Sequence, residues 1–326
     1  MNPQATPYRS VLVTGAGGYI GRQLVTALAA DRRELTTIVA SDLHLPPTRE
    51  RLPGIDYLAA DICSPELAQA FVKYEIDVVV HLAAVVTPGR KPDRELAYRV
   101  DVLGTENVLE ACIAAGVEKI VYTSSGAAYG YHADNPAWLE EHHPLRGNDA
   151  FAYARHKRLV EEMLARCREA HPELEQLIFR TATILGATTR NQITNLFERK
   201  RIMGIRGADS PFVLIWDQDV VGAVLKGIFE GGSGIYNLAG DGVLTLPEMA
   251  RLMGKPYIAL PAGLVRAALW AGKRLGLTQY GPEQVGFLRH RPVLSNRRLK
   301  TEFGYIPGKT TREVFDFYLE RRRQAT

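Results

Sequence analysis

The stretch Val11-Leu-Val-Thr-Gly-Ala-Gly-Gly-Tyr-Ile-Gly21 decides the fold of this chain. Its first residues predict a short buried strand, and its last residues open a helical pattern that continues through Leu24. Gly15, Gly18 and Gly21 permit a tight turn, close approach of the backbone to a pyrophosphate, and close packing of the helix on the strand. The N-terminus of that helix offers unpaired N–H groups to phosphates. Because strand, turn and helix occur in this order, we interpret the stretch as a dinucleotide site rather than a plain turn.

The same alternation of apolar runs and helical patterns continues to about residue 180. The runs are apolar throughout, which is typical of strands buried on both faces of a parallel sheet. The predicted strands are Val11–Val13, Leu35–Ala40, Tyr57–Ala59, Val78–Leu82, Ile120–Thr123 and Leu177–Phe179. Residues 95–115 and 153–169 are the longest predicted helices. The pattern indicates the α/β class, with a Rossmann-type doubly wound parallel sheet.

The rhythm breaks after Arg180, where shorter elements are separated by many glycines. A chain of 326 residues is long enough for two lobes. We predict a dinucleotide-binding Rossmann domain over residues 1–180. Residues 181–326 are predicted to form mainly a smaller α+β substrate-binding lobe, with some segments returning to the first domain. Phe212–Trp216 and Ile235–Leu238 are the most visible strands of this second part.

Asp42 follows the second predicted strand and bears on the choice of cofactor. An acid at this place accepts hydrogen bonds from the adenosine ribose hydroxyls and repels a 2′-phosphate. It therefore favours NAD over NADP. Two alternatives stay open, because an aspartate at a strand end also forms turns, and because His44, Arg49 and Arg51 could reach a 2′-phosphate.

Tyr153, Lys157 and Ser125 are the candidate catalytic residues. The phenol and the ammonium lie one helical turn apart on one face, and a nearby positive charge lowers the pKa of a tyrosine toward working pH. Such a tyrosine can exchange a proton with an alcohol or ketone oxygen. Ser125 and its neighbour Ser124 end a strand at the ligand-binding edge of the sheet. Each feature also has a plain structural reading, as an exposed helix pair or a serine that caps a turn.

Taken together, the motifs resemble the extended short-chain dehydrogenases/reductases, the family that includes NAD-dependent sugar epimerases and dehydratases. They occur in the family's order and span most of residues 11–186. The matching stretches are Thr14–Gly21, Asp61-Ile62, His81–Ala84, Gly104–Asn107, Ser124–Gly130, Tyr153–Lys157 and Arg180–Gly186.

The resemblance implies a function, a cofactor site and a homodimer. It implies that hydride moves between NAD(P) and a secondary alcohol or ketone carbon of a sugar, nucleotide sugar or other small molecule, with Tyr153 as acid/base and Ser125 as the catalytic serine. The dimer is expected to form through the helices around 95–115 and 153–169. The alternative is a non-catalytic dinucleotide-binding sensor or scaffold. The expected cofactor-binding residues are Gly15, Gly18, Tyr19, Ile20, Gly21, Asp42, Asp61, Ile62, Leu82, Ala83, Ala84, Tyr153 and Lys157.

Three departures from the family pattern narrow the reaction. Gly126 and Ala127 stand where dehydratases carry an acid, which disfavours elimination. Ser210-Pro211 replaces an arginine that pairs with a substrate diphosphate, so a nucleotide-diphosphate sugar is in doubt. The candidates to replace that arginine are Arg206, Arg289 and Arg291. Asp101 replaces an asparagine, and we expect it to face Arg99 or Lys157, because an unpaired buried carboxylate is unfavourable.

Composition bears on the remaining partners. A net charge of +4, without a nucleic-acid-reading motif, predicts no nucleic-acid partner. Three cysteines without metal spacing indicate a reducing, cytoplasmic setting, and His132, His142 and His143 lack the carboxylate spacing of a metal site. No apolar run reaches the length of a membrane span, so no membrane partner is expected. The apolar stretch Leu260–Leu277 is either a lid or an amphipathic helix packed on its own lobe.

Overall fold

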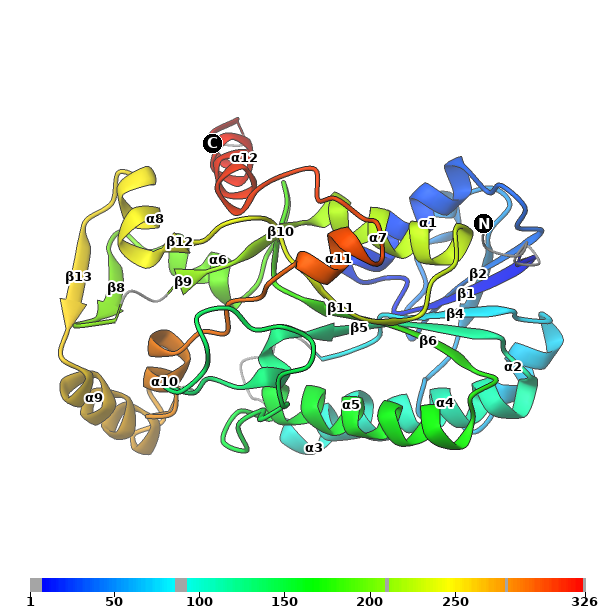
Figure 1. The fold of residues 1–326 in the computed structure, drawn as a ribbon, viewed down its shortest axis with the longest axis horizontal. Helices are drawn as coiled ribbons and strands as arrows, with labels where there is room; N and C mark the ends of the chain where they lie inside the picture. Colours follow the sequence, from blue (N-terminus) through cyan, green and yellow to red (C-terminus); the bar gives the residue numbers. More distant parts are fainter. Residues whose placement is uncertain (1–7, 86–92, 209–210, 279–280, 325–326) are drawn as a thin grey trace.

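A seven-stranded parallel sheet forms the centre of the molecule (Figure 1). The computed structural model describes residues 8–85, 93–208, 211–278 and 281–324. The strand order β11-β6-β5-β4-β1-β2-β3 confirms the predicted doubly wound fold class. The strands are β1 (Ser10–Thr14), β2 (Thr37–Asp42), β3 (Asp56–Ala59), β4 (Val78–His81), β5 (Lys119–Ser125), β6 (Glu175–Thr181) and β11 (Gly234–Leu238).

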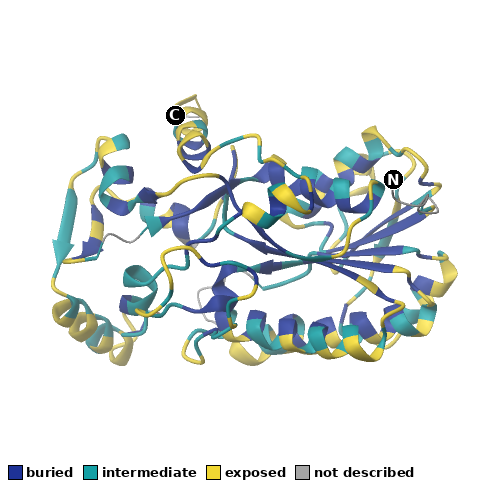
Figure 2. Cartoon of the chain, in the orientation of Figure 1, coloured by how far each residue is buried: buried dark blue, intermediate teal, exposed yellow. Residues whose placement is uncertain are grey.

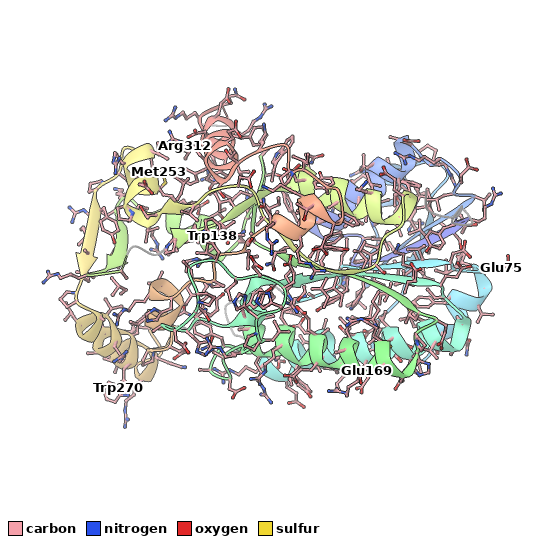
Figure 3. All side chains as sticks on the ribbon, in the orientation of Figure 1. Glu75, Trp138, Glu169, Met253, Trp270 and Arg312 are labelled. Atoms are coloured by element: carbon pink, nitrogen blue, oxygen red, sulfur yellow. The ribbon has the colours of Figure 1, made fainter. Side chains whose placement is uncertain are left out.

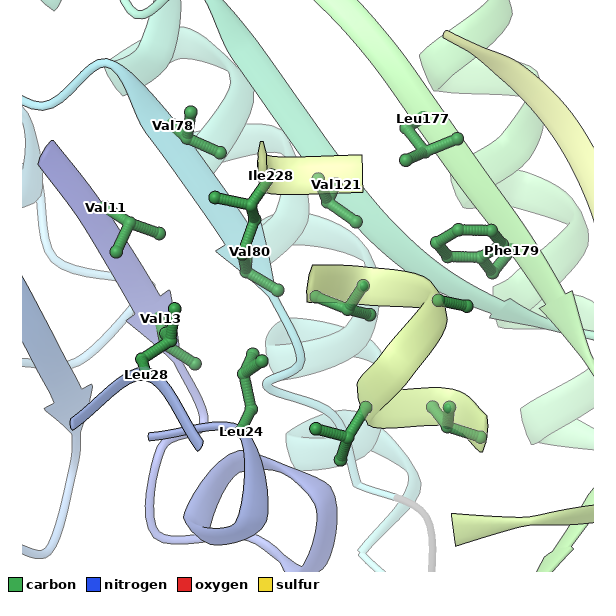
Figure 4. Close-up of a cluster of buried hydrophobic side chains, with 14 of the residues drawn as sticks. Val11, Val13, Leu24, Leu28, Val78, Val80, Val121, Leu177, Phe179 and Ile228 are labelled. Atoms are coloured by element: carbon green, nitrogen blue, oxygen red, sulfur yellow. The ribbon is translucent and has the colours of Figure 1, made fainter. Parts of the chain in front are cut away.

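Helices cover both faces of this sheet (Figure 1). Alternate side chains of β1 point to opposite cores, since Val11 and Val13 pack with Leu24 on one face while Leu12 packs with Val108 on the other. Figure 4 shows the first of these cores, and in Figure 2 the strands are buried along most of their length. The first face carries α1 (Tyr19–Ala30) and α7 (Asp217–Phe229), and the second carries α2 (Leu67–Lys73), α4 (Gly104–Ala115) and α5 (Ala152–Ala170).

Two sequence-based assignments need correction. The strand at Ile235–Leu238 belongs to the central sheet, where it pairs with β6, and not to the smaller lobe. Its alternate residues Tyr236 and Leu238 enter the core under α7, which explains its return to the first domain. The predicted helix 95–115 is three segments: α3 (Arg94–Tyr98), a π-helical turn (Arg99–Leu103) and α4. Such turns often mark functional sites.

The smaller lobe is assembled from two-stranded pairs and short helices around its own core. β13 (Tyr257–Leu260) pairs with β8 (Ile202–Ile205), β12 (Leu244–Thr245) with β9 (Pro211–Phe212), and β10 (Leu214–Trp216) with β7 (Thr183–Leu185). Within the described ranges no helix is both long and apolar enough to cross a membrane. The remaining helices are α6 (Gln192–Phe197), α8 (Leu246–Leu252), α9 (Ala262–Arg274), α10 (Gln284–Arg289), α11 (Arg297–Thr301) and α12 (Thr311–Gln324).

Candidate active site

The three candidate catalytic residues lie together at the carboxyl end of β5. Ser125 is the last residue of that strand, and Tyr153 and Lys157 occupy the first two turns of α5, which contacts it. Burial raises the pKa of Tyr153 to about 12, and a hydrogen bond with Ser125 acts to lower it. The Lys157 Nζ atom lies 5.9 Å from the centre of the Tyr153 ring. The fold therefore assembles two hydroxyls and an ammonium at the edge where parallel sheets bind ligands.

Lys157 ties α5 to β5 from a buried position. Its Nζ donates to the Tyr122 hydroxyl at 2.9 Å and to the Thr123 carbonyl at 2.8 Å. Burial lowers its pKa to about 8, and the carboxylates of Asp101 and Glu161 act in the opposite direction. The sequence predicted a lowered pKa for Tyr153, whereas in the structure burial gives a net upward shift of that pKa. The ammonium is directed at Tyr122 and Thr123, while burial sets the high pKa of the tyrosine.

The two serines at the end of β5 have different roles. Ser125 accepts a hydrogen bond from the Ala127 amide at 3.1 Å, which caps the short 3₁₀ helix Gly126–Tyr129. It therefore caps a turn and faces Tyr153 at once. Ser124 instead donates to the buried Glu161 carboxylate, which also receives Arg180. Ser124 thus belongs to a buried network behind the site.

Close backbone packing around the glycine turn requires glycine at two of its positions. Gly15 adopts a φ of +70°, and a Cβ at this position would lie 2.6 Å from the Ala83 amide nitrogen. A Cβ on Gly21 would lie 2.2 Å from the Gly15 carbonyl oxygen. The N-cap residue of α1, Gly18, has no capping side chain. Asp42 lies beside the turn and accepts from the Gly17 amide at 2.9 Å.

The other predicted cofactor residues lie in α1 or follow β3 and β4. Ala83 lies in the segment after β4, and its backbone packs against Gly15. The Leu82 amide donates to the Thr14 carbonyl at 3.2 Å. Asp61 accepts from the Cys63 amide at 2.9 Å. The remaining four lie in α1 or follow β3 and β4: Tyr19, whose hydroxyl donates to Asp217 at 2.5 Å, Ile20, the buried Ile62, and Ala84.

Asp101 pairs with His156, a residue that the sequence did not single out. Asp101 Oδ2 lies 2.9 Å from His156 Nδ1, and both side chains are buried. Its other oxygen accepts from the Val85 amide at 2.7 Å. The expected partners Arg99 and Lys157 were therefore wrong as direct contacts. In the sequence, the only sign of this pair was the aspartate at position 101 where the family has asparagine, since a buried carboxylate needs a partner. His156 has no sequence motif of its own that would identify it as that partner.

Arg291 and Arg289 are both partly buried, and Arg291 is the candidate arginine that packs on aromatic rings. It lies 3.9 Å from the centre of the Phe212 ring, and its Nη2 donates to Thr183 at 3.2 Å. Burial lowers its pKa to about 10, and its Nη1 has no hydrogen-bond partner among the described residues. It also stacks on Phe287, which in turn contacts Phe151 near the start of α5. Arg291 thus brings an unsatisfied positive charge to the junction of the lobes.

The three histidines do not converge. His132 Nε2 lies 2.7 Å from the Arg146 carbonyl oxygen, whereas His142 and His143 stack on each other with ring centres 4.2 Å apart. Over the described ranges, no cluster of three or more histidine, cysteine or acidic side chains is arranged to hold a metal.

A model of the NAD dependent epimerase/dehydratase family matches residues 11–215 of the chain. An uncharacterized protein of Mycobacterium tuberculosis is 27% identical over 316 residues, which cover 96% of this chain and 84% of that protein. The short-chain dehydrogenase/reductase family 42E member 1 of Macaca fascicularis is 34% identical over 128 residues, 38% of this chain and 31% of its own length.

Solved structures are similar over nearly the whole chain. The UDP-glucose 4-epimerase of Thermus thermophilus, solved as a complex with NAD, superposes with a TM-score of 0.74 at 25% identity. The match covers 97% of this chain and 100% of that one.

Proposed function

Because the chain belongs to the NAD dependent epimerase/dehydratase family, we propose that it transfers hydride between NAD and a secondary alcohol or ketone carbon of a small molecule. The observation that carries the proposal is the hydrogen bond between Ser125 and Tyr153, with the buried Lys157 ammonium near the tyrosine ring. A scaffold that only bound a dinucleotide would have no need of this trio.

The residues present fit a bound NAD. The glycine turn leads directly into α1, whose N-terminus has no capping side chain, so its N–H groups are available to a pyrophosphate. Asp42 would receive the adenosine ribose, and Lys157 the nicotinamide ribose. Asp61 and Ile62 would lie by the adenine, with Ala83 and Ala84 along the dinucleotide. When bound, NAD supplies an acceptor or donor of hydride.

Tyr153 would act as the acid/base on the substrate oxygen. Ser125 would hold that oxygen by a hydrogen bond, so that the phenol of Tyr153 meets it at the correct angle. The Lys157 ammonium would stabilise the phenolate form once a proton has left the phenol. Its bonds to Tyr122 and Thr123 fix the ammonium in place before substrate arrives.

The structure supports a substrate with an anionic group. Arg291 has an unsatisfied buried N–H, and a buried polar group of this kind favours any ligand that satisfies it. Nucleotide sugars are therefore candidate substrates again. Gly126 and Ala127 still provide no acid for an elimination reaction. We propose oxidation, reduction or epimerisation rather than dehydration.

A substrate panel tests the proposed function. Secondary alcohols, ketones, sugars and nucleotide sugars would be incubated with the protein and NAD or NADH. Nicotinamide absorbance reports net oxidation or reduction, and product chirality reports epimerisation. We expect turnover of at least one class, with Arg291→Met raising KM most for anionic substrates. Tight NAD binding without turnover of any class would favour the sensor or scaffold alternative.

Asp42 should give the protein a preference for NAD. Calorimetry should show NAD binding roughly 10-fold or more tightly than NADP, because the carboxylate repels a 2′-phosphate. Asp42→Asn should reduce the ratio of NAD affinity to NADP affinity, whereas Asp56→Asn on the neighbouring strand should leave this ratio unchanged. An NADP affinity tenfold above that of NAD would remove Asp42 from this role.

A homodimer should form through the face of α4 and α5. Leu103 and Leu96 expose apolar surface beside these helices, and burial of such surface drives association. Light scattering at micromolar concentration should therefore show a dimer, which Leu103→Asp dissociates. Val72→Asp, at an exposed position of α2, is the matched control. A monomer at all concentrations would contradict the prediction.

A further inference from the structure

Helix α9 lies at the outer edge of the smaller lobe (Figure 1). It carries exposed apolar side chains. We propose that α9 docks on the surface of an anionic lipid membrane, lying flat in the interface. This differs from a membrane-crossing helix, which the described residues lack. It revises the expectation from sequence that no membrane is a partner. It does not rest on the proposed reaction.

None of the thirteen residues of α9 is buried. Leu264 is 59% exposed and Trp270 57% exposed, and in Figure 3 Trp270 points away from the rest of the chain. Just after the helix, Leu275 and Leu277 are 71% and 79% exposed. Leu264, Ala268 and Leu275 recur at helical spacing and so share one face. Four large apolar side chains on one short segment form a patch that interaction surfaces typically carry.

The charges around this patch match an anionic surface. Arg266, Lys273 and Arg274 lie on α9, which contains no acidic residue. Arg206 adds a fourth cation, since its amide donates to the Leu260 carbonyl at 2.8 Å, where β13 runs toward α9. Among these four, Lys273 has a carboxylate partner in the described part of the chain, Glu283 at 3.4 Å.

Leucine, tryptophan, lysine and arginine together are the composition of helices that lie in the membrane interface. The leucines and the indole enter the boundary between headgroups and acyl chains, while lysine and arginine extend their charged ends to lipid phosphates. The Arg274 guanidinium already lies 5.6 Å from the centre of the Trp270 ring. A second copy of the chain would meet the same cations on its own α9, which makes a symmetric contact between two such helices unfavourable.

Docking would also orient the candidate active site. A cavity of about 360 Å³ is lined by Arg266 of α9 together with Tyr131 and Phe151. Phe151 immediately precedes α5, the helix that carries Tyr153. The mouth of this cavity would therefore lie next to the lipid headgroups.

Co-sedimentation of the full chain with vesicles tests the proposal. We expect binding to mixed phosphatidylcholine–phosphatidylglycerol vesicles, weakening as salt is raised, and little binding to pure phosphatidylcholine. Leu264→Ser combined with Trp270→Ser should lower the partition coefficient ~10-fold or more, because two large apolar groups no longer enter the interface. Lys273→Ser combined with Arg274→Ser should do so through lost attraction to anionic lipid, by ~10-fold.

Matched variants make the test specific. Val72→Ser with Ile306→Ser removes two apolar residues elsewhere that are at least as exposed as Leu264 and Trp270. Arg321→Ser with Arg323→Ser removes two cations from α12. Both pairs should bind vesicles as the parent does. Brominated lipid should quench tryptophan fluorescence in the parent and in Trp138→Phe but not in Trp270→Phe. Circular dichroism checks that every variant is folded.

Two results would overturn the proposal. The first is vesicle binding that is absent, or that the α9 variants and their controls share equally. The second is a dimer in vesicle-free solution that Leu264→Ser with Trp270→Ser converts to monomer, which would assign the α9 surface to a second copy of the chain.

Discussion

Tyr153→Phe should lower turnover by about 10² to 10⁴ while NAD affinity stays near that of the parent. The substitution removes one hydroxyl and keeps the ring. The high pKa of Tyr153, about 12, means that the free phenol holds its proton firmly near neutral pH. A large rate loss is expected because no other described phenol is hydrogen-bonded to Ser125 to replace it. Single-turnover kinetics and calorimetry measure the two quantities separately.

Lys157→Met should damage both quantities, because the ammonium is assigned to stabilise the phenolate and to hold the nicotinamide ribose. Tyr318→Phe is the matched control, since it deletes a phenol hydroxyl from a buried tyrosine of α12. Parent-like turnover by Tyr153→Phe would remove Tyr153 from the acid/base role. The assignments of Ser125 and Lys157 would then fall with it.

Arg180→Met should lower the free energy of unfolding by about 3–5 kcal/mol, because it leaves the Glu161 carboxylate buried and unpaired. Arg180 donates to Glu161 Oε2 through Nε at 2.8 Å and Nη2 at 2.7 Å, and both side chains are buried. Burial is the largest single effect and lowers the pKa of Arg180, but Glu161 and Tyr129 together raise it above the ordinary value. Urea denaturation measures the loss.

The double variant Arg180→Met, Glu161→Met should recover much of that stability, since it removes the unpaired charge together with its partner. The exposed pair Arg298 and Glu302 is the control, because breaking it should change the unfolding free energy by only about 0–1 kcal/mol. A loss of unfolding free energy for Arg180→Met below about 3–5 kcal/mol would contradict the conclusion that the buried ion pair stabilises the fold.

Much of the fold could be predicted because its signals are local. Strands buried on both faces read as apolar runs, so six of the seven strands of the central sheet were placed in the first domain from sequence. β11 could not be assigned to that sheet, since its partner β6 lies far away in the sequence. The break near Asp101 was hidden as well, because a π-helical turn has the apolar pattern of a continuous helix.

The candidate site divides in the same way. Gly15 was found from sequence because the glycine spacing within one turn is a local signal, and Tyr153 and Lys157 became candidates because their pair on one helix face follows that turn. His156 was missed because its partner Asp101 comes from a different helix. The pKa of Tyr153 was predicted in the wrong direction, since burial depends on every element packed around the ring.

The sequence by itself determined the glycine turn and the parallel sheet, because backbone sterics and hydrophobic periodicity act between near neighbours. It also proposed Ser125, Tyr153 and Lys157 as candidate catalytic residues. Only the tertiary structure decided which charges are buried and with what partners. It placed Arg291 under aromatic rings and left α9 uncovered. Those outcomes depend on contacts between residues distant in the chain, and desolvation and pairing are properties of such contacts.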